Sequence, residues 1–456
     1  MHLTAADIAA RAGGTVVGDP GALVTSWTFD SRAAREGSCF VALRGHRDGH
    51  DFVADAFRAG ARVALVDRAV PHLDLAARAL VHTGDALRAL QDVAASVRRD
   101  RADLRVVAVT GSTGKTSTKD LLAAALASAA VHANPESYNN EFGLPITLLD
   151  APPGTAVVVT EMGERFPGDI AALCRIARPR YGIVTNVGLA HAEHLGGPEG
   201  VAAVLGELLE ALPPDGVAVL DADDPWSGWL ASRTAATVRT VGFGERADHR
   251  ISRVEVDARL RPSFELDGRR VPVPLRGAHQ VVNAACAVVV AHHVLGLPWD
   301  DVVRDLQGAR GARWRMEVQE SATGVIVLND AYNANPASMT AALHALAHVG
   351  VPGRRIAVLG DMRELGAHGD AAHAEAGRLA SALGIDWVVG VGEGGARIVQ
   401  AARAAGAEAE AVADATAAAD LVAAAASRGD AVLVKASRAL GLQAVAEHLL
   451  RVRAGR

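Results

Sequence analysis

Residues 105–117 read Arg-Val-Val-Ala-Val-Thr-Gly-Ser-Thr-Gly-Lys-Thr-Ser. The apolar, β-branched first half predicts a buried strand, and the segment 118–130 predicts a helix that the Lys-Thr pair opens. A glycine-rich turn between a strand and a helix is the layout of a phosphate-binding loop (P-loop). Because Gly111 and Gly114 carry no Cβ, backbone N–H groups of this turn can approach phosphate oxygens closely.

The residues that follow this turn predict binding of ATP with Mg²⁺. Lys115 would neutralise the β- and γ-phosphates, and the Thr116 hydroxyl would hold the metal. Val109 stands where the general motif has glycine, so the chain fits a shorter form, Thr-Gly-x-x-Gly-Lys-Thr. Glu161 follows the apolar strand 156–160, where an acidic residue is expected to give a further Mg²⁺ contact. A chance Lys-Thr pair and a solvated strand end are the alternatives, and the order of strand, turn and helix disfavours them.

The composition is that of a globular chain. It has 456 residues, of which 50% are hydrophobic and 21% charged, and this length predicts roughly two to four domains. A formal net charge of −6 without a basic stripe argues against nucleic acid as the main partner. The three cysteines are scattered, which is typical of a reducing compartment. We read no signal peptide and no membrane-spanning run, so a cytoplasmic protein without membrane insertion is expected.

The alternation of apolar strands with helical segments predicts an α/β fold in three domains. We expect a small α/β domain over residues 1–103, and a central P-loop domain with a mostly parallel sheet over 104–311. Residues 312–456 are expected to form a Rossmann-like, doubly wound parallel sheet. Within the central domain, 250–274 alternates in the manner of antiparallel strands. No Gly-x-Gly-x-x-Gly follows the first strand of the last domain, so a dinucleotide is not indicated there.

Polar loops after apolar segments are candidate binding sites. Arg32 could hold a diphosphate or a carboxylate through two hydrogen bonds, and a solvated turn is an equally open alternative. The loop 134–145, rich in Asn, Gly and Pro, suggests a role in facing a substrate or nucleotide. His191, Glu193 and His194 follow another buried-type strand and could bind a metal, although loop histidines are usually only solvated.

Together these motifs resemble the Mur ligases, the ATP-dependent amide-forming enzymes of peptidoglycan precursor synthesis. The resemblance covers almost the whole chain. Its most specific parts are Asn-Asp-Ala-Tyr-Asn-Ala-Asn-Pro at 329–336 and Leu-Gly-Asp-Met-Arg-Glu-Leu-Gly at 359–366. They are typical of the branch that adds a dipeptide, whereas the branches that add single amino acids have a histidine in the Asp-Tyr segment. The other segments that carry the resemblance are 30–32, 48–52, 110–116, 139–145, 161–163 and 185–187.

The resemblance implies a role for each domain. The first would bind the UDP end of UDP-N-acetylmuramoyl-tripeptide, the second ATP, and the third the incoming D-alanyl-D-alanine, in a monomer. Carried over by position, the ATP phosphates would lie against Gly111, Ser112, Thr113, Gly114, Lys115, Thr116 and Ser117. His279 and Asn283 would contact the adenine side, and Arg315 and Asp330 would reach ATP from the third domain. Thr116 and Glu161 would bind the first Mg²⁺ and His191 a second one. Ser31 and Arg32 would bind UDP, and Asn333 and Asn335 other parts of the substrates; Lys115, Glu161, His191 and Asp330 would be catalytic.

The chain departs from the family pattern on the helix after His191. The family usually has a carbamylated, metal-bridging lysine there, whereas this chain has Leu205 within Val-Leu-Gly-Glu. Leucine cannot be carbamylated and cannot ligate a metal. We expect Leu205 to face the active site and the second Mg²⁺ to be held weakly, with Glu193, Glu207 or water as alternative ligands. Smaller departures are Gln280, Asp221 and Ala436.

The implied chemistry suits these residues. A carboxylate is a poor electrophile, so the γ-phosphate of ATP would first convert it to an acyl phosphate, which the dipeptide amine then attacks. Lys115 and Mg²⁺ would stabilise the phosphoryl charge, and domain closure would exclude water. Two alternatives remain. A folylpolyglutamate synthase has a similar short P-loop but begins near it, so the first domain disfavours it. A nucleotide-binding scaffold without ligase activity is favoured only by Leu205.

Overall fold

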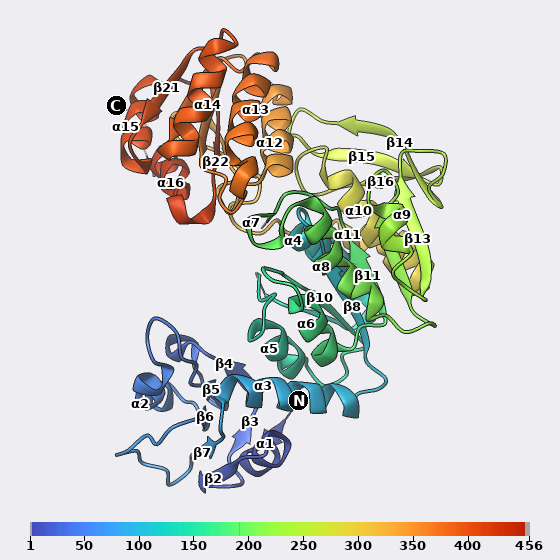
Figure 1. Ribbon diagram of the computed structural model, residues 1–456, viewed down its shortest axis with the longest axis vertical. Coiled ribbons are helices and arrows are strands. Elements are labelled where there is room, and N and C mark those ends of the chain that lie inside the picture. Colours follow the sequence, from blue (N-terminus) through green and yellow to red (C-terminus); the bar gives the residue numbers. More distant parts are fainter. Residues whose placement is uncertain (1, 136, 191, 452–456) are drawn as a thin grey trace.

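The computed structural model describes residues 2–135, 137–190 and 192–451. Figure 1 shows an N-terminal and a C-terminal α/β domain at opposite ends of the molecule, with the central domain between them. This arrangement confirms the expected fold class. The proposed boundaries after residues 103 and 311 fall in loops that precede β8 and β17. Within the described ranges, no helix combines the length and the apolar character needed to cross a bilayer.

The N-terminal domain has a five-stranded sheet in the order β2-β7-β6-β5-β4, parallel except for the β2–β7 pair. Helix α3 buries Leu90, Val93 and Val97 on one face, as its helical spacing of apolar residues predicts. The elements are β1 (Leu3–Thr4), α1 (Ala5–Ala12), β2 (Thr15–Gly18), β3 (Leu23–Val24), β4 (Ser26–Thr28), η1 (Ser31–Ala33), β5 (Ser38–Val41), η2 (Gly49–Phe52), α2 (Val53–Arg58), β6 (Val63–Val66), β7 (Ala79–His82) and α3 (Ala86–Asp100).

The central domain is built on a sheet whose described strands run in the order β16-β15-β14-β13-β12-β11-β8-β10-β9. Strand β8 lies between β11 and β10 and is parallel to both, and its β-branched run is buried on both faces. Strands β14 to β16 pair antiparallel, as predicted. The elements are β8 (Arg105–Thr110), α4 (Lys115–Ala125), η3 (Ala127–Ala129), β9 (Val131–Ala133), α5 (Gly143–Asp150), β10 (Val157–Glu161), α6 (Asp169–Ala177), β11 (Tyr181–Val184), α7 (Ala192–Leu195), α8 (Pro198–Glu210), β12 (Val217–Asp221), α9 (Ser227–Ala231), β13 (Thr237–Gly242), β14 (His249–Val256), β15 (Pro262–Leu266), β16 (Arg269–Pro272), α10 (Gln280–Val288), the π-helix η4 (Val289–Val294) and α11 (Trp299–Leu306).

The C-terminal sheet has the order β17-β18-β22-β19-β20-β21 and is parallel except at one edge. There β17 runs antiparallel to β18, so the expected doubly wound parallel arrangement holds for the other strands of this sheet. Only the turn 321–325 joins the two, and so short a connection permits antiparallel pairing alone. The elements are β17 (Glu317–Glu320), β18 (Ile326–Asn329), α12 (Pro336–His348), β19 (Arg355–Gly360), η5 (Gly366–His368), α13 (Gly369–Ala382), β20 (Trp387–Val391), α14 (Gly392–Ala404), β21 (Ala409–Val412), α15 (Ala415–Ala425), β22 (Ala431–Lys435), η6 (Arg438–Leu440) and α16 (Gln443–Arg451).

Polar and aromatic contacts join the first domain to the central one. Arg98 on α3 donates to the carbonyl oxygens of Ala177 and Arg178, at 2.9 and 3.2 Å. The backbone N–H of Trp27 donates to Asp150 Oδ1 at 2.9 Å. Asp150 ends helix α5, where the helix dipole disfavours a negative charge. Burial raises the pKa of the Asp150 carboxyl to about 6.

Asp150→Asn is expected to stabilise the protein in a pH-dependent way. Because the folded-state pKa lies above the unfolded value, the native state binds the extra proton, and stability falls as pH rises from about 4 to above 6. The side-chain amide of the variant keeps an acceptor for the backbone N–H of Trp27 but cannot ionise. The free energy of unfolding should therefore rise by at most about 3 kcal/mol at pH 8 and by almost nothing at pH 4. Thermal unfolding of both proteins at the two pH values measures it. An equal change at both would contradict this account.

Candidate ATP-binding and catalytic site

The two glycines of the P-loop are required by close neighbours. Gly111 has φ 136° and Gly114 has φ 87°, values that disfavour residues with a Cβ. A Cβ at Gly111 would collide with the Thr185 hydroxyl, and one at Gly114 would lie 2.6 Å from Asn283 Oδ1. The loop therefore keeps its open conformation only with glycine at both positions.

The residues that follow β11 hold the P-loop in place through hydrogen bonds. Asn186 accepts from the Ser112 N–H at 3.0 Å through its carbonyl oxygen, and from the Thr113 N–H at 3.1 Å through Oδ1. The Thr185 hydroxyl donates to the Thr113 carbonyl oxygen at 2.6 Å. The next N–H groups, at the start of α4, have no partner within the helix and carry its positive partial charge. A rigid loop thus presents a helix N-terminus to an anion.

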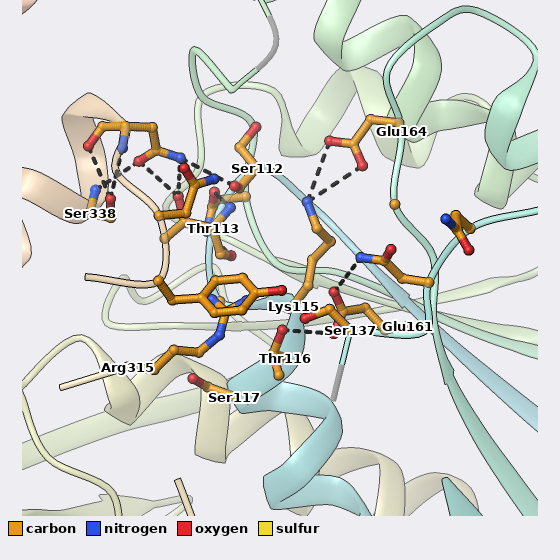
Figure 2. A pocket seen from close by; sticks show the side chains of 18 of the residues that line it. Ser112, Thr113, Lys115, Thr116, Ser117, Ser137, Glu161, Glu164, Arg315 and Ser338 are labelled. Atoms are coloured by element: carbon orange, nitrogen blue, oxygen red, sulfur yellow. Dashed lines mark hydrogen bonds and ion pairs between the residues drawn. The ribbon is translucent and has the colours of Figure 1, made fainter. Parts of the chain in front are cut away.

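Lys115 is paired with an acidic residue that the sequence did not single out. Its Nζ lies 3.4 Å from both carboxylate oxygens of Glu164 and also donates to the Gly111 carbonyl oxygen. Figure 2 shows the two side chains pointing toward each other inside the cleft. The Glu164 side chain is fully buried (0% exposed). A buried carboxylate is costly without a cation beside it, so Glu164 and Lys115 stabilise each other here.

Thr116 and Glu161 lie together, as predicted for a metal site. The Thr116 hydroxyl donates to Glu161 Oε2 at 2.7 Å (Figure 2). Asn139 Nδ2 donates to Glu161 Oε1 at 2.7 Å. Hydroxyl and carboxylate oxygens are the donors that Mg²⁺ prefers. The residues therefore fit this ion chemically.

The C-terminal domain touches the P-loop directly through Asn335. This residue caps helix α12, where its Oδ1 accepts from the Ser338 N–H at 2.9 Å. Its Nδ2 donates to the Ser112 carbonyl oxygen at 3.3 Å and to Thr113 Oγ1 at 3.1 Å. The Asn335 side-chain amide is thus already hydrogen-bonded to the P-loop.

Asp330 holds a second buried lysine of the site. Lys435 Nζ lies 2.6 Å from Asp330 Oδ2 and donates to the Asn333 carbonyl oxygen at 3.0 Å. Asp330 Oδ1 also accepts from the Met316 N–H at 2.9 Å, which fixes the segment before β17. Sequence reasoning missed Lys435. Its signal was a lysine at the carboxyl end of a buried parallel strand, where α/β proteins place ligand contacts.

The predicted adenine-side residues lie at the start of α10. Asn283 Nδ2 donates to Gln280 Oε1 at 2.9 Å, and Gln280 Nε2 lies 2.9 Å from His279 Nε2. Across the cleft, the Arg315 guanidinium stacks over the Tyr332 ring, 4.1 Å from its centroid. Both sets of residues line the same cleft.

These side chains line one cleft of about 900 Å³ to which all three domains contribute, the first through Gln91. The structure thus brings together most of the predicted site. The predicted residues that line the cleft are Ser112, Thr113, Gly114, Lys115, Thr116, Ser117, Glu161, His279, Asn283, Arg315, Asp330, Asn333 and Asn335. Gly111 does not line the cleft, and His191 is outside the described residues.

The predicted UDP-site residues lie apart from this cleft. Arg32 in η1 has a side chain that is 88% exposed, and its Nη2 is 2.7 Å from Asp30 Oδ2. The hydrogen bonds from Arg32 lower the pKa of Asp30. Phe29 packs edge-on against Phe142 of the loop before α5, with ring centroids 4.9 Å apart. The role of Ser31 and Arg32 stays a prediction.

The expectation that Leu205 faces the active site is wrong. Its side chain is fully buried in the hydrophobic core, and it does not line the cleft. Glu207 accepts from the N–H groups of Gly168 and Ala171, at 2.7 and 2.9 Å, and so caps the start of α6. The Glu193 N–H donates to the Glu364 carbonyl oxygen at 3.1 Å, a further contact between the central and C-terminal domains.

Comparison with known proteins agrees with this architecture. Residues 109–291 match the Mur ligase middle domain, and residues 314–438 match the Mur ligase, glutamate ligase domain. A UDP-N-acetylmuramoyl-tripeptide–D-alanyl-D-alanine ligase of Mycobacterium tuberculosis is 40% identical over 92% of this chain and 91% of its own length. The Bacillus subtilis protein of that name is 34% identical, with 92% of each chain covered.

Solved structures of MurF have the same fold as this chain. MurF from Acinetobacter baumannii superposes with a TM-score of 0.87 at 28% identity, covering 99% of each chain. MurF ligase from Thermotoga maritima in complex with ADP gives a TM-score of 0.77 at 28% identity, covering 94% of this chain and 97% of that one. The chain therefore belongs to the Mur ligase family, in the branch of the UDP-N-acetylmuramoyl-tripeptide–D-alanyl-D-alanine ligases.

Proposed function

We propose that this protein joins D-alanyl-D-alanine to UDP-N-acetylmuramoyl-tripeptide in peptidoglycan precursor synthesis, with release of ADP and phosphate. The observation that carries this proposal is the cleft itself, in which a P-loop and residues from all three domains converge. The names of the relatives and the ADP-bound Thermotoga maritima structure support it. We further propose that it acts in the cytoplasm, as a monomer.

The central domain would hold ATP so that its γ-phosphate can pass to the tripeptide carboxylate. The α4 N-terminus and Lys115 would bind the phosphates, and Lys115 would exchange Glu164 for the phosphoryl oxygens. Thr116 and Glu161 would hold Mg²⁺, which supplies further neutralisation of phosphoryl charge when bound. The dipeptide amine would then attack the acyl phosphate and displace phosphate, and closure of the domains would exclude water from the cleft.

The outer domains would position the other two substrates. Asn333 would contact substrate beside Lys435, whose ammonium group is held by Asp330. Asn335 would act by positioning the P-loop, since its amide is already hydrogen-bonded there. His279 and Asn283 on one side, and Arg315 and Asp330 on the other, would contact ATP, with Ser31 and Arg32 at the UDP end.

Glu164 would supply the carboxylate that Leu205 cannot. Glu164 lines the cleft beside Lys115, and carboxylate oxygens are ligands that Mg²⁺ prefers. It would therefore help to hold a second Mg²⁺, which supplies further neutralisation of phosphoryl charge when bound. Glu207 is unavailable for this because it caps α6. The second metal would then be held without carbamylation, so added bicarbonate should not change activity.

The substrate requirement tests the proposed reaction. With purified protein, ATP and Mg²⁺, phosphate release is expected only when UDP-N-acetylmuramoyl-tripeptide and D-alanyl-D-alanine are both present, and mass spectrometry should show their amide. A single D-alanine should not replace the dipeptide. Lys115→Ala serves as the inactive control, because the phosphoryl charge loses its nearest cation. Binding of nucleotide without any turnover would instead identify a scaffold.

Glu164→Gln tests the second metal ligand. The amide keeps the shape but loses the charge, so the Mg²⁺ concentration for half-maximal activity should rise at least about tenfold. Binding of Mn²⁺ with ADP, followed by electron paramagnetic resonance, gives a readout that is independent of activity. Glu207→Gln is the matched control, which should lower stability but leave the metal requirement unchanged. An unchanged metal requirement in Glu164→Gln would contradict this role.

A further inference from the structure

A separate cluster of metal-ligating side chains lies where three elements of the central domain meet. His249 is the first residue of β14, Asp267 lies in the turn between β15 and β16, and His293 lies in the π-helix η4. Each residue offers a ligand atom, and these atoms all lie within 4.8 Å of one another. None of the three lines the nucleotide cleft.

The distances within this cluster suit a single cation. His249 Nδ1 is 2.8 Å and His293 Nε2 is 3.7 Å from Asp267 Oδ2. The two imidazole rings face each other with centroids 4.2 Å apart and planes 33° from parallel. In a tetrahedral site, metal–ligand distances of about 2.0–2.2 Å place neighbouring ligand atoms about 3.3–3.6 Å apart, so small side-chain rotations would bring all three residues onto one ion.

The backbone fixes the carboxylate of this cluster in place. Asp267 and Gly268 have φ values of 50° and 79°, as in the two-residue turn of a tight hairpin. Asp267 Oδ1 accepts from the Arg250 N–H at 2.9 Å, which leaves Oδ2 facing both histidines. The turn therefore presents one oxygen at a defined position.

The buried histidine is not fully satisfied by the protein. His249 is only 8% exposed, and its Nε2 has no hydrogen-bond partner in the described part of the chain. If His249 served only to hydrogen-bond the β15–β16 hairpin, both of its ring nitrogens would be expected to have hydrogen-bond partners. The ring is thus held by the protein at Nδ1 alone, which faces Asp267 Oδ2.

A third histidine lies close to this cluster, with the ring centroid of His292 4.6 Å from that of His293. His292 itself is bound to the Leu297 carbonyl oxygen through Nδ1 at 2.7 Å, so it is not counted among the ligands.

We propose that His249, Asp267 and His293 bind a divalent transition-metal ion of the Zn²⁺ type. Two imidazoles and one carboxylate suit such ions, whereas Mg²⁺ prefers oxygen ligands alone. The ion would tie the β15–β16 hairpin and the start of β14 to the end of the α10–η4 helix. The opposite end of this helix carries Asn283, which packs against Gly114 of the P-loop. The metal would therefore have a structural role, holding that helix in place.

Titration of the metal-free, full-length protein with Co²⁺ in excess Mg²⁺ tests this site. The wild type is expected to bind one equivalent with visible d–d absorption bands and to gain thermal stability. Asp267→Asn keeps the turn and an acceptor for the Arg250 N–H, and His293→Ala removes a partly exposed ring. Each variant should bind Co²⁺ at least about tenfold more weakly.

A double variant, His344→Ala with His348→Ala, controls for unspecific histidine binding. These exposed residues are one helical turn apart on α12, with ring centroids 6.4 Å apart. The double variant should keep the bound equivalent and its absorption bands. Wild-type Co²⁺ affinity in Asp267→Asn and His293→Ala, or loss of the bound equivalent in the α12 variant, would overturn the proposal.

Discussion

The docking of Asn335 on the P-loop is the contact on which the geometry of the site depends. One amide group caps helix α12 and donates to Ser112 and Thr113. The C-terminal domain is therefore placed relative to the phosphate site itself. Asp330 then fixes Lys435 and the segment before β17 on the same wall of the cleft. The hydrogen bonds between the central and C-terminal domains thus determine where the substrates can meet.

Much of the fold could be predicted because its signals are local. The apolar first half of 105–117 forms the predicted strand, β8, and the alternating segment 250–274 forms the antiparallel part of the central sheet. The direction of β17 could not be predicted in this way. Periodicity identifies a strand but not its neighbour, and here the short turn 321–325 decides the pairing.

The site was predictable from the residues themselves where its chemistry lies within one segment, or where a polar residue ends a buried strand, as Glu161 does. Gly111 and Gly114 follow from the backbone that a phosphate-binding turn needs. Glu164 meets Lys115 across 49 residues, and Lys435 meets Asp330 across 105, so no local spacing indicates either pair. The predicted orientation of Leu205 failed for a related reason. A helix with this many apolar residues has a broad buried face, and sequence alone does not tell which edge of it borders a cleft.

The kinetics of Asn335→Ser test most directly whether domain docking on the P-loop assembles the site. Serine keeps the helix cap but is too short to reach the loop. The variant should unfold like the wild type, while kcat/KM for ligation falls at least about tenfold through the loss of two hydrogen bonds. Asp414→Ser, the same kind of cap change on α15 far from the cleft, should leave kcat/KM unchanged. Wild-type kcat/KM in a correctly folded Asn335→Ser protein would contradict the account.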